Sequence, residues 1–163
     1  MQLFAEKMEK GSQEFCLLIS SGGGQVREGI TLYNFLKSLP IQLVTHNIGF
    51  VDSIANVVFL AGNKRYANPR SSFLFHGVGF DITQPTRFEE KELRERLTSL
   101  LREQALIASI IAERTNLKIE EIQRMFLEAA TKTPEEAKKL GIIDEIKEAH
   151  VPSGAEMISL VIH

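Results

Sequence analysis

The chain has 163 residues, 44% of them hydrophobic and 25% charged, which is typical of one globular domain and excludes a disordered or rod-like chain. The net charge of −2 gives no basic field that would favour nucleic acid or an anionic membrane, and the single cysteine, Cys16, excludes a disulfide framework. No apolar run of about 18 residues predicts a spanning helix, and no secretory signal is recognisable, so we expect a cytoplasmic protein.

Strands and helices alternate along the sequence, which predicts a layered α/β domain. The predicted strands cover residues 15–19, 42–48, 65–67, 72–75 and a last segment that begins at Ile142. The predicted helices cover residues 3–10, about 26–39, a short apolar stretch at 54–61, about 87–114, 119–127 and a final segment that starts at Thr133 and closes at Gly141. Thr133, Pro134 and Glu136 form a capping-box signal for the start of that final helix.

Three consecutive glycines, Gly22, Gly23 and Gly24, lie between the first strand and the helix that follows it. Glycine permits a sharp turn there and leaves backbone N–H groups that can hold a phosphate or a developing oxyanion. The alternative is a tight turn that only needs positive φ angles. Neither a P-loop nor a dinucleotide-binding glycine pattern is present.

Ser53 lies where a strand gives way to the short apolar helix, in the segment Gly49-Phe-Val-Asp-Ser53-Ile-Ala. A serine at such a junction can present its hydroxyl as a nucleophile beside the N–H of the next residue, although the segment is not a G-x-S-x-G motif. The alternative is that Ser53 or Asp52 is simply the N-cap of the helix.

His76 ends the strand at 72–75 and precedes a glycine, a position from which an imidazole can reach a cleft and act as a general base. His46 lies inside a strand, and His150 and His163 lie near the C-terminus; we interpret these three as structural or solvated. The four histidines have no close-spaced pattern, so no metal site is predicted.

Together these segments resemble the proteolytic subunit of the Clp protease family, self-compartmentalising serine peptidases of the crotonase-like superfamily. The matching segments are Ile19-Ser-Ser-Gly-Gly-Gly24 with the helix ending in Tyr33-Asn34, Gly49-x-x-x-Ser53, Leu60-Ala-Gly62 with Lys64-Arg-Tyr66, Asn68-Pro-Arg-Ser-Ser-Phe-Leu-Phe-His76, and Thr133-Pro-Glu-Glu-Ala137 with Gly141-Ile-Ile-Asp144. The resemblance covers about residues 2–148. It implies one α/β domain over residues 1–163, a crotonase-like (ClpP-type) ββα superhelix with a protruding handle helix.

The resemblance also implies roles for individual residues. Ser53 would be the nucleophile, and His76 the base that takes its proton and later protonates the leaving amine. The N–H groups of Gly24 and Ile54 would form the oxyanion hole. Residues 79–114 would form the handle, a strand and a long helix that interlock two rings of subunits. No cofactor is implied; peptides or unfolded proteins would be the substrates, and the chain would form a homo-oligomer without nucleic-acid or membrane partners.

Three departures from the family pattern bear on activity. The triad acid would lie at Ala129, which cannot orient an imidazole; Glu128 should point elsewhere, and Thr131 or another acid brought in by the fold could substitute. The second residue after His76 is Val78, where the family usually has proline. The family's N-terminal loop and first strand, which help to dock an ATPase unfoldase, are missing, which argues against that partner.

Three functions are compatible with these observations. The first is a serine peptidase that hydrolyses peptide bonds through an acyl-enzyme on Ser53 inside an oligomeric chamber. The second is a non-catalytic Clp-like assembly subunit, which Ala129 favours and the intact Ser53 and His76 oppose. The third is an acyl-CoA enzyme of the crotonase type, a family that typically uses a carboxylate rather than a Ser-His pair.

Overall fold

The computed structural model describes residues 14–82, 84–151 and 153–155. The helix predicted at residues 3–10 therefore lies outside the described residues, as does His163. Across the described ranges strands and helices alternate, which confirms the predicted α/β class.

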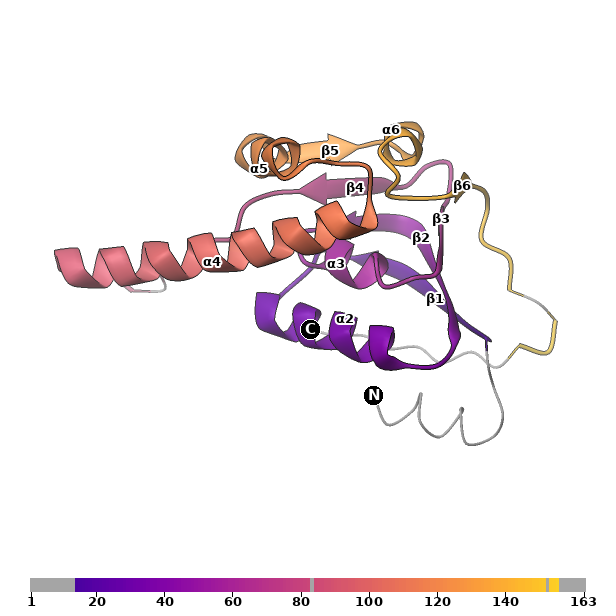
Figure 1. Cartoon of the computed structure of the whole chain (residues 1–163), viewed down its shortest axis with the longest axis horizontal. Helices are drawn as coiled ribbons and strands as arrows, with labels where there is room; N and C mark the ends of the chain where they lie inside the picture. Colours follow the sequence, from indigo (N-terminus) through magenta and orange to yellow (C-terminus); the bar gives the residue numbers. More distant parts are fainter. Residues whose placement is uncertain (1–13, 83, 152, 156–163) are drawn as a thin grey trace.

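A six-stranded sheet runs through the described part of the chain (Figure 1). Its strands are β1 (Glu14–Ser21), β2 (Gln42–Asp52), β3 (Lys64–Ala67), β4 (Ser72–Phe75), β5 (Ala130–Lys132) and β6 (Glu145–Ile146). The long strand β2 pairs in parallel with β1, β3 and β4, β3 pairs in parallel with β6, and β5 pairs antiparallel with β4. Because β1, β2 and β4 are parallel, the residues that follow these three strands lie at the same edge of the sheet.

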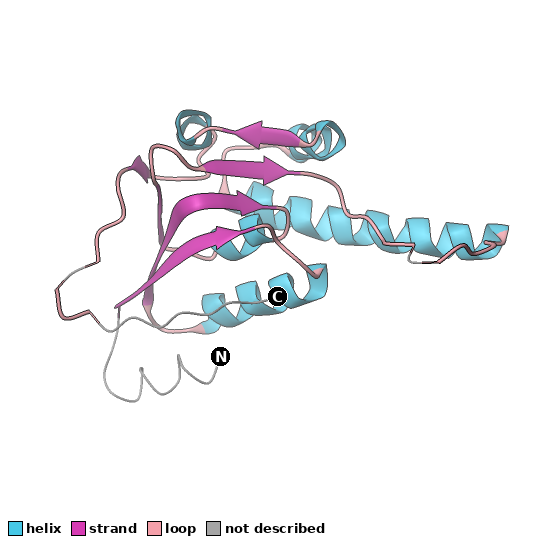
Figure 2. Cartoon of the chain, turned by 180° about the vertical axis from the view of Figure 1, so that it is seen from behind, coloured by secondary structure: helices cyan, strands magenta, loops and turns pink. Residues whose placement is uncertain are grey.

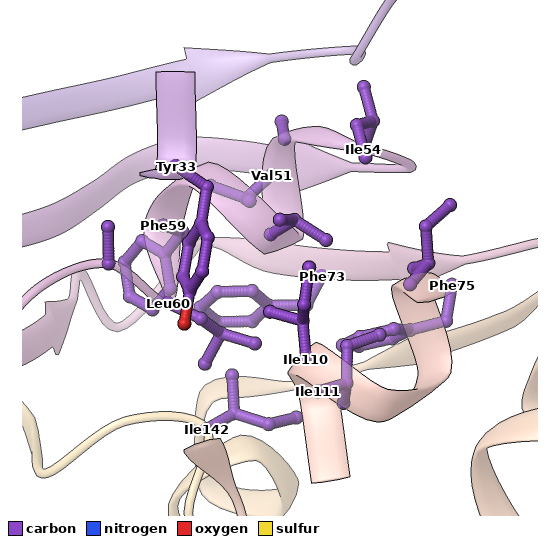
Figure 3. Packing of buried hydrophobic residues seen from close by; sticks show 14 of the residues in the cluster. Tyr33, Val51, Ile54, Phe59, Leu60, Phe73, Phe75, Ile110, Ile111 and Ile142 are labelled. Carbon is purple, nitrogen blue, oxygen red and sulfur yellow. The ribbon is translucent and has the colours of Figure 1, made fainter. Parts of the chain in front are cut away.

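Helices pack around the sheet and share one hydrophobic core with it (Figure 3). They are α2 (Val26–Ser38), α3 (Ala55–Phe59), α4 (Glu90–Arg114), α5 (Ile119–Glu128) and α6 (Pro134–Lys139). Val51 from β2, Phe59 from α3 and Phe73 from β4 are wholly excluded from solvent, and the Phe59 and Phe73 rings meet edge to face with centroids 5.2 Å apart. This packing fixes the ends of β2 and β4 relative to α3, which is where the candidate site lies.

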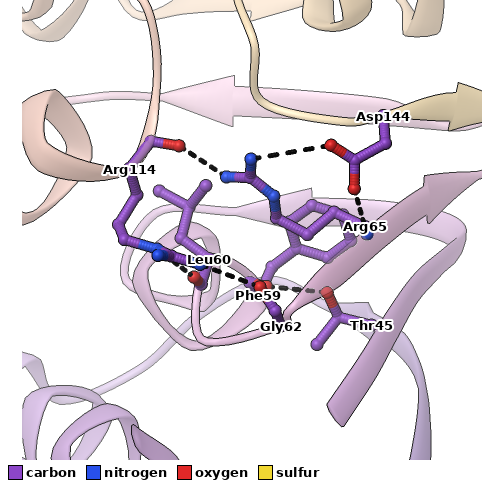
Figure 4. Close-up of polar contacts among 7 residues, drawn as sticks. All are labelled: Thr45, Phe59, Leu60, Gly62, Arg65, Arg114 and Asp144. Carbon is purple, nitrogen blue, oxygen red and sulfur yellow. Dashed lines mark hydrogen bonds and ion pairs between the residues drawn. The ribbon is translucent and has the colours of Figure 1, made fainter. Parts of the chain in front are cut away.

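Two arginines tie the end of α4 to α3 and β3 (Figure 4). Arg114 donates from Nε to the Leu60 carbonyl at 3.1 Å and from Nη2 to the Gly62 carbonyl at 2.9 Å. Arg65 donates from Nη1 to the Arg114 carbonyl, and its backbone N–H donates to the Asp144 carboxylate at 2.8 Å. Burial lowers the pKa of Arg65, and the nearby positive charge of Arg114 lowers it further.

Most predicted boundaries lie within three residues of the observed ones, but β2 continues to Asp52 where the prediction ended at residue 48, and the last strand is misplaced. Thr133 and Glu136 form the predicted capping box, with the Thr133 N–H donating to the Glu136 carboxylate at 2.8 Å. The strand predicted to begin at Ile142 begins at Glu145 instead. The Ile142 N–H donates to the Ala137 carbonyl at 2.8 Å, so the apolar pair that suggested a strand closes α6 and fills the core.

The segment between β4 and α4 differs from the expectation for a handle, because its described residues form no strand. A regular β-strand is disfavoured in this segment by Gly77, Gly79 and Pro85. The Arg96 guanidinium instead lies over the rings of Phe80 and Phe88, at 5.0 and 4.9 Å from their centroids, and these contacts attach the segment to α4.

Helix α4 extends well beyond the sheet (Figure 2). It begins at Glu90, three residues later than predicted, because the preceding residues are extended rather than helical. Leu93, Leu97 and Leu101 are 48%, 56% and 56% exposed, and the fully buried residues of α4 lie in its second half. Among the described helices, none combines the length and apolar composition that crossing a membrane requires.

Candidate active site

Ser53 occupies a sharp turn between β2 and α3. Its φ angle of 56° lies in the left-handed region, which residues with side chains rarely adopt. Its N–H donates to the Leu74 carbonyl on β4 at 2.9 Å. A strained strand-to-helix turn of this kind is the geometry that exposes the serine nucleophile in α/β-hydrolases. The alternative interpretation as an N-cap is wrong, because Ile54 occupies the N-cap position of α3 and no side chain caps the helix.

A buried asparagine, Asn56, holds this turn against β4. Its Nδ2 donates to the carbonyl of Ser53 at 3.1 Å and to that of Leu74 at 2.8 Å, and its backbone N–H also donates to Ser53 at 3.1 Å. The sequence reasoning missed this residue. The signal was present, because Asn56 is the one strongly polar side chain within the apolar stretch at 54–61.

His76 follows the end of β4, the strand that pairs with the last residues of β2. Its ring is exposed, and Nδ1 lies 2.8 Å from the Gly77 carbonyl oxygen. Since a carbonyl can only accept a hydrogen bond, Nδ1 carries the proton and Nε2 has a free lone pair. The structure therefore brings Ser53 and His76 to neighbouring strand ends, without a hydrogen bond between the two described side chains.

The three glycines follow β1 on the other side of β2, where Ser21 pairs with Val51. Gly23 and Gly24 have φ angles of 96° and 153°, so the turn does need residues without a side chain. A Cβ atom on Gly23 would lie only 2.8 Å from the Ser53 Cβ. Among the described residues, neither the N–H of Gly24 nor that of Ile54 has a hydrogen-bond acceptor, so both remain able to bind an external oxygen.

Replacement of Gly23 by alanine is expected to displace the Ser53 turn, because the added methyl group would also lie 2.9 Å from the Asp52 carbonyl oxygen and would require a positive φ. We expect a loss of any Ser53-dependent activity of about a hundredfold. Gly22→Ala is the matched control, since a Cβ there meets nothing within 4 Å. Equal rates for the two variants, measured with a short fluorogenic peptide, would contradict this assignment.

Asp52, immediately before Ser53, is a half-buried carboxyl group that the sequence reasoning considered only as a helix cap. Burial raises its pKa above the ordinary value. A backbone hydrogen bond from Leu74 opposes this rise, and so does the charge that His76 carries when it is protonated.

The position expected for a triad acid holds a methyl group. Ala129 ends α5 with a left-handed φ of 49°, and the chain continues into β5, where Ala130 pairs with Phe75. Ala129 thus directly precedes the residue of β5 that pairs with Phe75, and His76 directly follows Phe75. Glu128 and Thr131 are exposed, and no described carboxylate accepts a hydrogen bond from His76.

A family model described as Clp protease matches residues 1–150. The chain belongs to the Clp protease family. At the level of the family, its activity is that of a peptidase. The match spans the glycine turn, Ser53, His76 and the segment around Ala129, so the whole candidate site lies within the Clp protease region.

The remaining described histidines lie apart from this site of the Clp protease domain. His46 is buried in β2, where Nε2 lies 3.0 Å from the Lys147 carbonyl oxygen and the ring meets Tyr66 edge to face. This environment confirms its interpretation as a structural histidine. His150 is exposed beyond β6.

Proposed function

We propose that this chain is a serine endopeptidase subunit that cleaves peptide bonds through an acyl-enzyme on Ser53. One observation carries the proposal. Ser53, in its left-handed turn after β2, lies between the glycine turn that follows β1 and His76, which follows β4. The nucleophile, the base and two free N–H groups therefore lie at the carboxyl ends of three neighbouring strands, as acyl transfer requires.

In this mechanism Nε2 of His76 accepts the hydroxyl proton while Ser53 Oγ forms a bond to the peptide carbonyl carbon. The N–H groups of Gly24 and Ile54 bind the oxyanion of the tetrahedral intermediate. His76 then donates the proton to the leaving amine as the C–N bond breaks. Water, deprotonated by His76, hydrolyses the Ser53 ester and restores the free hydroxyl group.

A groove next to the glycine turn offers a place for a substrate side chain. It lies between α2 and α4, has a volume of about 550 Å³ and begins at Val26, two residues after Gly24. Ile30 and Leu106 supply apolar surface, and Arg27 pairs with Glu103 at 3.6 Å within it. This lining favours a side chain with an apolar body.

The exposed leucines of α4 support an oligomer in which this helix serves as the handle. Leu93, Leu97 and Leu101 recur every four residues and so form one stripe along the projecting half of the helix. An apolar stripe of this length is characteristic of a surface that another subunit covers. The proposed assembly is a closed homo-oligomer of crotonase-like (ClpP-type) subunits that encloses the Ser53 sites.

A catalytically impaired assembly subunit is the second candidate, and it is favoured by Ala129, which supplies no carboxylate at the position expected for the triad acid. Loss of the acid from a Ser-His-Asp triad lowers turnover by about 10⁴-fold. The left-handed turn at Ser53 favours the active peptidase over this candidate, since an assembly subunit needs no such strain.

A fluorophosphonate probe, which reacts covalently with activated serines, separates the two candidates. We expect the wild-type protein to be labelled and Ser53→Ala to remain unlabelled. Ser38→Ala is the matched control, because Ser38 is an exposed serine at the end of α2 whose hydroxyl donates to the Phe35 carbonyl at 2.7 Å. Unlabelled wild-type protein would contradict the peptidase and support the assembly subunit.

A further inference from the structure

As a general base, His76 needs a nearby negative charge, which neither the Gly77 carbonyl nor the Ala129 side chain provides. When it takes the proton of Ser53 it becomes an imidazolium, and in a Ser-His-Asp triad a buried carboxylate stabilises that cation. Here the Gly77 carbonyl holds Nδ1 at 2.8 Å, which sets the tautomer but contributes only a dipole. Ala129, at the position expected for a triad acid, contributes no charge.

The register of β2 and β4 places Asp52 on the same face of the sheet as His76. Asp52 pairs with Leu74, and residues two apart in an extended chain point to the same face, so Leu74 and His76 lie on one face. The alternate residues Val51, Phe73 and Phe75 point into the core and are at most 1% exposed. Asp52 is the last residue of β2 and His76 directly follows the last residue of β4, so the two residues lie at adjacent ends of paired strands.

The charged groups on the elements around His76 identify Asp52 as its partner. Glu128 at the end of α5 is exposed, and Lys132 on β5 lies 3.8 Å from the Glu136 carboxylate. From α4 the neutral amide of Gln104 approaches Gly77, and the glycine turn after β1 carries no charge. Among the described residues, Asp52 is the half-buried carboxyl group that the pairing of β2 with β4 places next to the strand end from which His76 follows.

We propose that Asp52 is a positioning residue for His76, whose carboxylate stabilises the imidazolium formed during acyl transfer in place of a triad acid. The proposal rests on the proposed function, because it concerns the base of the same reaction. No atom is exchanged with Asp52: the proton moves from Ser53 to His76 and on to the leaving amine, while the carboxylate stays ionised. The half-buried setting makes its charge more effective than that of an exposed carboxylate.

The test is the rate of fluorophosphonate labelling as a function of pH for wild type and Asp52→Asn. Asparagine keeps an oxygen that can accept the Leu74 backbone hydrogen bond but removes the charge. We expect labelling of Asp52→Asn at neutral pH to be about tenfold slower than that of wild type. On the acid side of the pH profile the rate falls as His76 becomes protonated, and we expect this acid limb to lie about one pH unit lower in the variant. The limb moves down because the neutral amide no longer favours the protonated imidazole. Asp81→Asn, an exposed aspartate in the loop after His76, is the charge-matched control.

Asp52→Glu and Asp52→Gln repeat the comparison with side chains of equal size that differ only in charge, in case Asp52→Asn does not fold. Faster labelling and a higher acid limb for glutamate than for glutamine would support the proposal. If the wild type is labelled but the acid limb lies at the same pH in the charged and neutral variants, the role of Asp52 is overturned and the proposed peptidase stands. An unlabelled wild type would overturn both.

Discussion

Replacement of His76 by alanine is expected to lower kcat/KM for a short fluorogenic peptide by about 10³-fold or more. His76 is the only described histidine at the strand ends that surround Ser53, and a general base typically contributes about 10²–10⁴ in rate. When nucleophile and base act as a unit, loss of the base is nearly as damaging as loss of the nucleophile. The measurement is the initial rate of peptide hydrolysis at neutral pH.

His150→Ala is the control for that experiment, because His150 is an exposed histidine beyond β6. It should hydrolyse the peptide at the wild-type rate. If His76→Ala matched His150→Ala, the Ser53 hydroxyl would have to be activated by a different group, and the catalytic assignment of His76 would be wrong.

The second large effect is a gain of activity in Ala129→Asp. Residue 129 directly precedes β5, whose first residue pairs with Phe75, so an aspartate there could accept the hydrogen bond of Nδ1–H in place of the Gly77 carbonyl. We expect kcat/KM to rise about a hundredfold, less than the roughly 10⁴ that a triad acid can contribute, because the carbonyl already fixes the tautomer. Aspartate tolerates the left-handed φ of 49° better than alanine does, so the fold should not suffer.

Ala129→Asn separates the charge from the change of shape. Asparagine also adopts left-handed conformations readily and has nearly the same size, but it cannot stabilise an imidazolium. It should therefore leave kcat/KM close to the wild-type value. Equal rates for the aspartate and asparagine variants would show that residue 129 does not act on His76.

The sequence predicted those parts of the fold that local patterns determine. The apolar run at 15–19, the capping box at Thr133 and the periodicity at 119–127 each correspond to an observed element. The strand β5 could not be predicted, because Ala130–Lys132 has no strand pattern of its own and forms only against β4. The exposure of the α4 leucines could not be predicted for a related reason, since helical spacing shows that an apolar stripe exists but not what covers it.

The candidate site shows the same division between local and tertiary information. Ser53, His76 and the glycine turn stand at recognisable junctions between elements, but local patterns left their roles open, and the resemblance to the Clp protease family selected them as candidates. The polar side chain of Asn56 stands out within the apolar stretch at 54–61, but its partner Leu74 and the position of Asp52 depend on the pairing of β2 with β4, which no local pattern records. The Gly77 carbonyl beside Nδ1 of His76 is a backbone feature, which a search among side chains could not find.

The most direct test of the central claim, acyl transfer through Ser53, is to trap the acyl-enzyme. Turnover of an activated peptide ester would be stopped with acid, and the digested protein would be mapped by mass spectrometry. We predict an added acyl mass on the peptide that contains Ser53, and its absence from Ser53→Ala. Ester turnover in which that peptide stays unmodified, or in which Ser53→Ala reacts as fast as wild type, would contradict the account.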